Sequence, residues 1–120
     1  LAALLGGLGV CAGAFGAHAL RDVLDAHRME VFQTAAHYQL VHSALATALA
    51  LAAPPGRLYT ISTVAFVAGT LVFSGSLYLL VMLDMPWLGA LTPIGGVGFL
   101  VGWFTLAVAG WRHPRKNPEL

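Results

Sequence analysis

The side chains best suited to chemistry lie in one apolar stretch, residues 32–53 (FQTAAHYQLVHSALATALALAA). Tyr38, Gln39 and His42 supply a hydroxyl, an amide and an imidazole close together in this stretch. The stretch is long enough to cross a bilayer. Polar side chains at membrane depth cost free energy unless they face protein, water or a ligand. The three residues therefore predict either hydrogen bonds between helices or the polar end of an apolar pocket.

A pocket of this kind would bind a lipophilic molecule such as a quinone or a lipid, whose carbonyl oxygen accepts hydrogen bonds in an apolar cleft. Ser74 lies in the middle of a later apolar stretch, and its hydroxyl could reach across to the same groups. The candidate ligand-binding residues are Tyr38, Gln39, His42 and Ser74. The alternative is that these residues only join helices, since such bonds contribute about 0.6–2 kcal/mol each in membranes.

Haem, metal and catalytic sites are less well supported by the spacing. A haem would need His42 and His18 to face each other, but we expect His18 near the end of the first span, ~15 Å from the depth of His42. A metal needs three or four convergent ligands, and Cys11 and the histidines lie at different depths. Ser43 adjoins His42 but points about 100° away on a helix. We predict no catalytic residue, no metal site and no cofactor, and keep a small transporter or haem carrier as a third alternative.

The composition indicates an integral membrane protein. Of 120 residues, 58% are hydrophobic and 9% are charged, whereas about a quarter of the residues of a soluble domain are charged. The net charge of +1 excludes a basic surface for nucleic acid. We predict one all-α domain, an integral membrane four-helix bundle with short loops. Its expected parts are spans at about 1–20, 32–53, 58–83 and 88–111, an interfacial or helical connector at 21–31, and a basic tail at 112–120.

Glycines in the first and last spans favour close helix packing. Gly9 with Gly13, and Gly98 with Gly102, form GxxxG pairs, which let membrane helices approach closely. Residues 17–19 (AHA) resemble a signal-peptide cleavage site, but no basic segment precedes the apolar run. We therefore expect a retained first span, and because the sequence does not begin with Met we also expect a short N-terminal piece to be missing.

Basic residues predict the orientation in the membrane. Four spans place both termini on one side, together with the turn near residue 57. By the positive-inside rule the side richer in Lys and Arg is cytoplasmic, or faces the matrix in a mitochondrion. Four basic residues fall on the side of the termini and two on the other: Arg57, Arg112, Arg115 and Lys116 against Arg21 and Arg28. We expect a bacterial inner membrane or the mitochondrial inner membrane.

Several ordered motifs resemble one known family. They are GAFGAH at 13–18, FQTA at 32–35, Tyr38-Gln39 with His42, FSGSLY at 73–78 and GALTPIGG at 89–96. Together they resemble the domain-of-unknown-function family 423, which includes the animal transmembrane protein 256. The resemblance implies a small, mostly four-helix membrane protein, and it implies no activity. We expect a non-catalytic accessory or scaffold subunit that packs against other membrane helices, in a larger complex or a homo-oligomer.

Overall fold

The computed structural model describes residues 1–113, and the predicted basic tail at 112–120 lies mostly outside the described residues. The chain forms α1 (Ala2–His18), α2 (Ala26–Ala52), α3 (Arg57–Leu83), a short 3-10 helix η1 (Pro86–Ala90) and α4 (Thr92–Arg112). No strand occurs between residues 1 and 113. The prediction of an all-α bundle is confirmed.

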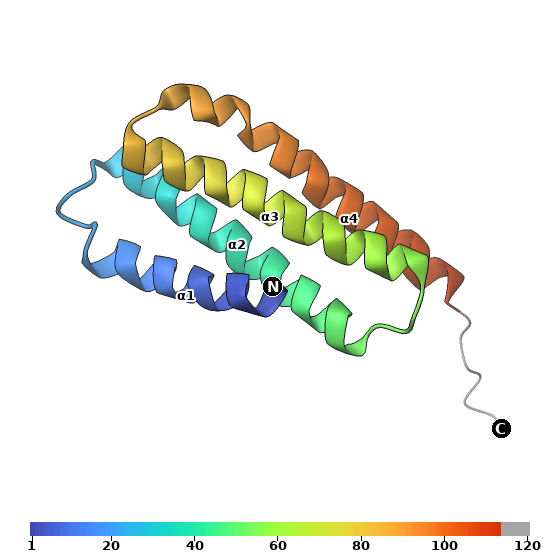
Figure 1. Cartoon of the computed structure of the whole chain (residues 1–120). Helices are drawn as coiled ribbons and strands as arrows, with labels where there is room; N and C mark the ends of the chain where they lie inside the picture. Colours follow the sequence, from blue (N-terminus) through green and yellow to red (C-terminus); the bar gives the residue numbers. More distant parts are fainter. Residues whose placement is uncertain (114–120) are drawn as a thin grey trace.

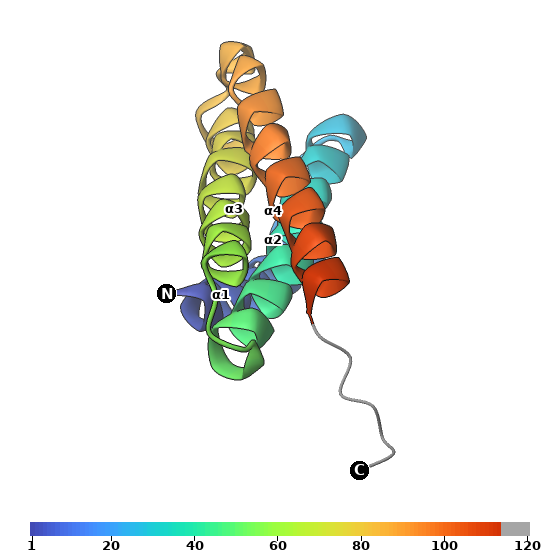
Figure 2. The same ribbon diagram turned by 90° about the vertical axis from the view of Figure 1, so that its right-hand side faces the viewer.

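Each helix packs mainly on the next one along the chain. α1 lies along α2, α2 along α3, and α3 along α4 (Figure 1). In the view turned by 90°, α4 lies beside α3 and in front of α2 (Figure 2). Because packing follows the chain order, helices two apart, such as α1 with α3, leave grooves between them.

Local chemistry accounts for where α2 begins and ends. The Asp25 side chain accepts a hydrogen bond from the backbone N–H of Arg28 at 2.9 Å, which is an N-cap interaction. The second half of the expected connector at 21–31 is therefore the first turn of α2. The helix ends before Pro54, because the residue preceding a proline disfavours the helical conformation.

Arg28 joins α2 to α3 at the end of the bundle where α2 begins. Its guanidinium donates to the carbonyl oxygen of Val81, and it lies 3.9 Å from the Asp84 carboxylate. Asp84 ends α3 in the left-handed conformation, at a φ of 53°. The ion pair itself contributes little because Asp84 is exposed. The bond to Val81 joins the first turn of α2 to the last turn of α3.

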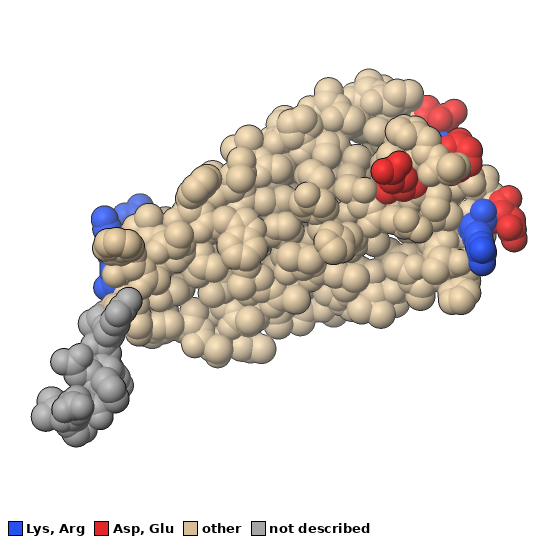
Figure 3. Space-filling model, turned by 180° about the vertical axis from the view of Figure 1, so that it is seen from behind, with Lys and Arg blue, Asp and Glu red and all other residues tan. Residues whose placement is uncertain are grey.

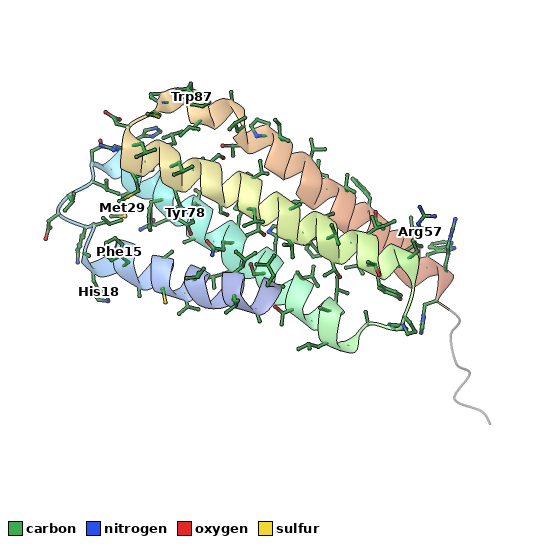
Figure 4. All side chains as sticks on the ribbon, viewed as in Figure 1. Phe15, His18, Met29, Arg57, Tyr78 and Trp87 are labelled. Carbon is green, nitrogen blue, oxygen red and sulfur yellow. The ribbon has the colours of Figure 1, made fainter. Side chains whose placement is uncertain are left out.

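The surface has the character of a membrane protein. Two segments are long and apolar enough to cross a bilayer, Arg57–Leu83 and Pro86–Arg112, and Ala2–His18 is a shorter apolar helix. Charged side chains gather at the two ends, and the surface between them is uncharged (Figure 3). Arg57 marks one end and Trp87 the other (Figure 4). Large apolar side chains along this middle are exposed, as contact with lipid requires.

Three of the four predicted packing glycines lie in tight helix contacts. A Cβ added at Gly9 would come within 3.1 Å of Leu40, and one at Gly102 within 2.6 Å of the Phe66 ring. At Gly98 it would come within 3.0 Å of the Cα of Gly69. A side chain at any of these positions would have to displace its neighbour, so the helices approach closely there.

Gly13 does not pack against another helix. A Cβ added to it would meet nothing within 4 Å. The contact of α1 with α2 runs instead from Gly9 to Gly16, whose added Cβ would lie 2.8 Å from Phe32. Gly9 and Gly16 are seven residues apart, about two helical turns. The GxxxG spacing at Gly9 and Gly13 therefore does not coincide with the row of residues that faces α2.

Gly95 and Gly96 allow a matched test of the packing of α4 on α3. A Cβ at Gly95 would lie 2.7 Å from the Cα of Phe73, whereas one at Gly96 would meet nothing within 4 Å. We expect Gly95→Ala to destabilise the fold by about 1–3 kcal/mol, because backbone cannot give way as a flexible side chain does. Thermal unfolding in detergent measures this cost. Gly96→Ala is the control and should unfold like the wild type; equal behaviour of both variants would contradict the packing.

Candidate functional site

His42 lies at the centre of α2 and uses both ring nitrogens. Its side chain is buried, and Nδ1 lies 2.8 Å from the carbonyl oxygen of Tyr38. The indole N–H of Trp103 donates to Nε2 at 3.3 Å. A carbonyl oxygen only accepts and an indole N–H only donates, so Nδ1 carries the proton and Nε2 does not. The hydrogen bonds therefore assign His42 as the neutral Nδ1–H tautomer.

Aromatic rings from three helices surround His42. The Phe99 ring of α4 stacks on the imidazole with centroids 3.6 Å apart, and the Phe66 ring of α3 lies at 5.6 Å. Tyr38 of α2 stacks at 5.7 Å from the imidazole. We call this set, with Phe73 and Trp103, the aromatic cluster. It joins α2, α3 and α4, and a hollow of about 490 Å³ beside it, the α2–α4 groove, is lined by Tyr38, His42 and Trp103 among others.

Gln39 is directed toward other neighbours than His42 and joins α2 to two further helices. Its Nε2 donates to the carbonyl oxygen of Leu5 in α1 at 2.7 Å. The Tyr78 hydroxyl of α3 donates to Oε1 at 2.8 Å. Tyr78 lies in the half of the bundle nearer His18 than Arg57 (Figure 4). Gln39 is thus a bridge between α1, α2 and α3.

Serine hydroxyls make further bonds between helices. Ser74 of α3 is buried and donates to the carbonyl oxygen of Ala35 in α2 at 2.8 Å. Ser62 donates in the same way to the carbonyl oxygen of Gly102 in α4. Ser74 therefore bonds to backbone, rather than to the side chains of Tyr38, Gln39 or His42 that the sequence suggested as partners.

The four predicted ligand-binding residues do not meet in one place. Tyr38 and His42 line the α2–α4 groove, whereas Gln39 and Ser74 line a hollow of about 250 Å³ between α1 and α3. Gln39 and His42 are three residues apart, which turns one from the other by ~60° around the helix. That angle is enough to direct them toward different neighbouring helices. A ligand role for these residues stays a prediction.

Several partners of the predicted residues were missed from the sequence. They come from other helices, namely Tyr78 and Phe66 of α3 and Phe99 and Trp103 of α4. The sequence did contain an indication for two of them, because Tyr78 and Trp103 each place a hydrogen-bond donor inside an apolar stretch. Their pairing with Gln39 and His42 depends on the depth at which the helices align.

The residues that the sequence analysis considered as haem or metal ligands lie apart. His18 is at the exposed end of α1 (Figure 4), whereas His42 is buried and lies in the middle part of α2. Both ring nitrogens of His42 are bonded within the bundle, to Tyr38 and Trp103. Within residues 1–113, no group of three or more His, Cys, Asp or Glu side chains could hold a metal ion.

The fold and these contacts define a class, namely helical integral membrane proteins whose buried polar side chains join neighbouring helices. The model of the family described as "Protein of unknown function (DUF423)" matches residues 12–96. The chain belongs to this family, as its motifs predicted.

Relatives in several bacteria are named as membrane proteins. The UPF0382 inner membrane protein YgdD of Escherichia coli (strain K12) is 40% identical over 97% of this chain and 90% of its own length. The UPF0382 membrane protein YwdK of Bacillus subtilis is 35% identical over 88% of this chain and 89% of its own. A UPF0382 membrane protein of Haemophilus influenzae is 37% identical, over 93% and 91%. No solved structure matches the chain.

The tautomer of His42 can be measured directly. In protein labelled with ¹⁵N-histidine, NMR at neutral pH should find the proton of this ring on Nδ1, because the Tyr38 carbonyl accepts it. The His42→Gln variant identifies the signal among the five histidines. Trp103→Phe should shift the Nε2 resonance and leave the Nδ1 proton in place. A proton on Nε2 in the wild type would show that the bond from Trp103 does not form.

Proposed function

We propose that this protein is a non-catalytic accessory or scaffold subunit that packs against other membrane helices, in a larger complex or a homo-oligomer. The observation that carries the proposal is that three buried polar side chains make hydrogen bonds between the helices of the bundle. Gln39 bonds α1 and α3, His42 bonds α4, and Ser74 bonds α2. This use of polar groups supports a role in holding a shape rather than in turning over a substrate.

The surroundings of His42 also support a role without catalysis. An activated serine needs a base with a free nitrogen in hydrogen-bond reach. Ser43 adjoins His42 in sequence, but its hydroxyl has no hydrogen-bond partner among the described residues. Both nitrogens of His42 are bonded elsewhere, to Tyr38 and Trp103. The pair therefore lacks the geometry of a nucleophile and its base.

The charge distribution supports a multi-pass arrangement with cytoplasmic termini. α1 to α4 would be the spans of a single membrane domain, in a bacterial inner membrane or the mitochondrial inner membrane. Four basic residues of the sequence fall at the start of α3 or at the end of α4 and beyond it: Arg57, Arg112, Arg115 and Lys116. The opposite end mixes both signs: Arg21, Arg28, Asp22, Asp25, Glu30 and Asp84. The positive-inside rule counts only Lys and Arg, four against two, and so places the end near Arg57 in the cytoplasm.

Labelling of single cysteines tests this orientation. Cys11 is the only cysteine, so Cys11→Ser provides a background for Val23→Cys in the α1–α2 turn and Pro55→Cys in the α2–α3 turn. An impermeant maleimide added to intact cells whose outer envelope has been opened should label Val23→Cys. Pro55→Cys should react only after the inner membrane is broken. The reverse pattern would invert the proposed topology, and equal labelling of both would refute a spanning α2.

The accessory role is tested by the size of the native particle. The tagged protein, extracted from its own membranes in a mild detergent, should migrate on a native gel well above a monomer, together with defined partners or further copies. A harsher detergent should release it as a monomer, which serves as the control. His42→Ala should lower thermal stability, because it removes two hydrogen bonds and the stacking on Phe99. A wild-type monomer in the mild detergent would contradict the proposal.

A further inference from the structure

A groove between α1 and α3 runs from the middle of the bundle toward the end that bears His18 and Trp87. Its inner part is the hollow of about 250 Å³, whose polar wall consists of Gln39, Thr70, Ser74 and Tyr78. A second hollow of about 480 Å³ has apolar walls that include Phe15, Phe32 and Met82. The two hollows share Ala12 and Tyr78, so they adjoin. We call them together the α1–α3 groove.

Thr70 is the unusual residue of this groove. Its side chain is 2% exposed, and its hydroxyl has no hydrogen-bond partner in the part of the chain that the structure describes. A threonine inside a helix can donate to the carbonyl four residues earlier. Thr47 and Thr63 do so, at 2.7 and 2.8 Å. A buried hydroxyl without a partner is unfavourable, so Thr70 is a donor that lacks an acceptor among residues 1–113.

A second donor lies in the same wall. The amide nitrogen of Gln39 gives one N–H to the Leu5 carbonyl, and a side-chain amide has two. The hydroxyl of Ser74 and that of Tyr78 are already donated to Ala35 and Gln39. Within the described chain, the inner hollow therefore has two free hydrogen-bond donors, the Thr70 hydroxyl and one N–H of Gln39. A ligand that fits them must carry an acceptor, such as a carbonyl oxygen.

The depth of Thr70 selects among molecules that carry a carbonyl. Thirteen residues of α3 precede Thr70 and thirteen follow it, so it lies ~20 Å from either end of the helix. The ester carbonyls of a phospholipid lie at the edges of a hydrocarbon layer about 30 Å thick, ~15 Å from its centre. They cannot reach Thr70 while the charged headgroup stays in water. A carbonyl on an uncharged ring can lie at this depth.

We propose that the α1–α3 groove binds a quinone, with its ring in the inner hollow and one carbonyl oxygen accepting a hydrogen bond from Thr70. Rotation about χ1 exchanges the methyl and hydroxyl of threonine and turns the hydroxyl toward the ring. The apolar tail follows the second hollow past Phe15, Phe32 and Met82. No charged side chain of the described residues lines either hollow, which suits a neutral ligand. The proposal does not depend on the accessory role.

Decylubiquinone and matched threonine variants test this site. The full chain is purified in mild detergent, and its thermal unfolding is followed at rising concentrations of decylubiquinone, since a ligand of the folded state raises the Tm. The variants are Thr70→Val, which keeps the shape and removes the hydroxyl, Thr70→Ser, which keeps the hydroxyl, and Thr63→Val, a control on the same helix outside the groove. A phosphatidylglycerol is the comparison ligand.

The quinone should raise the Tm of the wild type, Thr70→Ser and Thr63→Val at similar concentrations. Thr70→Val should bind about three- to tenfold more weakly, as expected for the loss of one hydrogen bond. Without ligand, Thr70→Val should be at least as stable as the wild type, because it removes an unpaired buried hydroxyl. This reversal between stability and binding separates a ligand role from a structural one.

Three results would overturn the proposal. The first is that the quinone does not shift the wild-type Tm. The second is that it shifts the Tm of Thr70→Val as much as that of the wild type, which would mean unspecific partitioning into the detergent micelle. The third is that the phospholipid shifts the wild-type Tm as much as the quinone does. A protein that migrates as a monomer on the native gel yet responds to the quinone would refute the accessory role alone. A large native complex without the quinone response would refute the quinone site alone.

Discussion

The constraint on which this structure depends is that polar groups surrounded by lipid must find their partners inside the protein. The constraint falls mainly on α2, because this 27-residue helix carries an amide and an imidazole near its middle. Gln39 forms hydrogen bonds with a backbone carbonyl of α1 and a hydroxyl of α3, and His42 accepts a hydrogen bond from an indole of α4. Each bond is modest in free energy, and each one also determines which helix lies on which side of α2.

Packing supports these bonds by bringing the helices close enough for them to form. Short side-chain-to-backbone bonds, such as that of Ser62 with the Gly102 carbonyl, need two helix backbones near each other. Glycine permits this approach, and the Phe66 ring lies against the space where Gly102 has no side chain. The same ring contacts His42 in the aromatic cluster. Small residues and large rings therefore act together: glycine leaves space at the helix interface, and an aromatic ring of the neighbouring helix fills it.

The candidate site shows where prediction from sequence succeeded and where it stopped. The polar residues of α2 were identified because they contradict the apolar character of their own span, and the structure indeed buries Gln39 and His42. Their separation into two grooves was not predicted, since a rotation of ~60° within one helix has no meaning until its neighbours are placed. Thr70 was overlooked for a related reason: a threonine in a span is ordinary when it bonds to its own helix, and only the structure distinguishes it from Thr63.

The sequence by itself determined the class of protein, the number of helices and the residues able to interact. Those properties follow from composition, from apolar runs of spanning length and from local signals such as the prolines after residue 53, all of which act over a few neighbouring residues. Only the tertiary structure decided that Gly16 rather than Gly13 continues the contact of α1, that Trp103 pairs with His42, and that Thr70 lacks a partner. These outcomes depend on the relative depth and rotation of helices far apart in the chain, which local sequence does not specify.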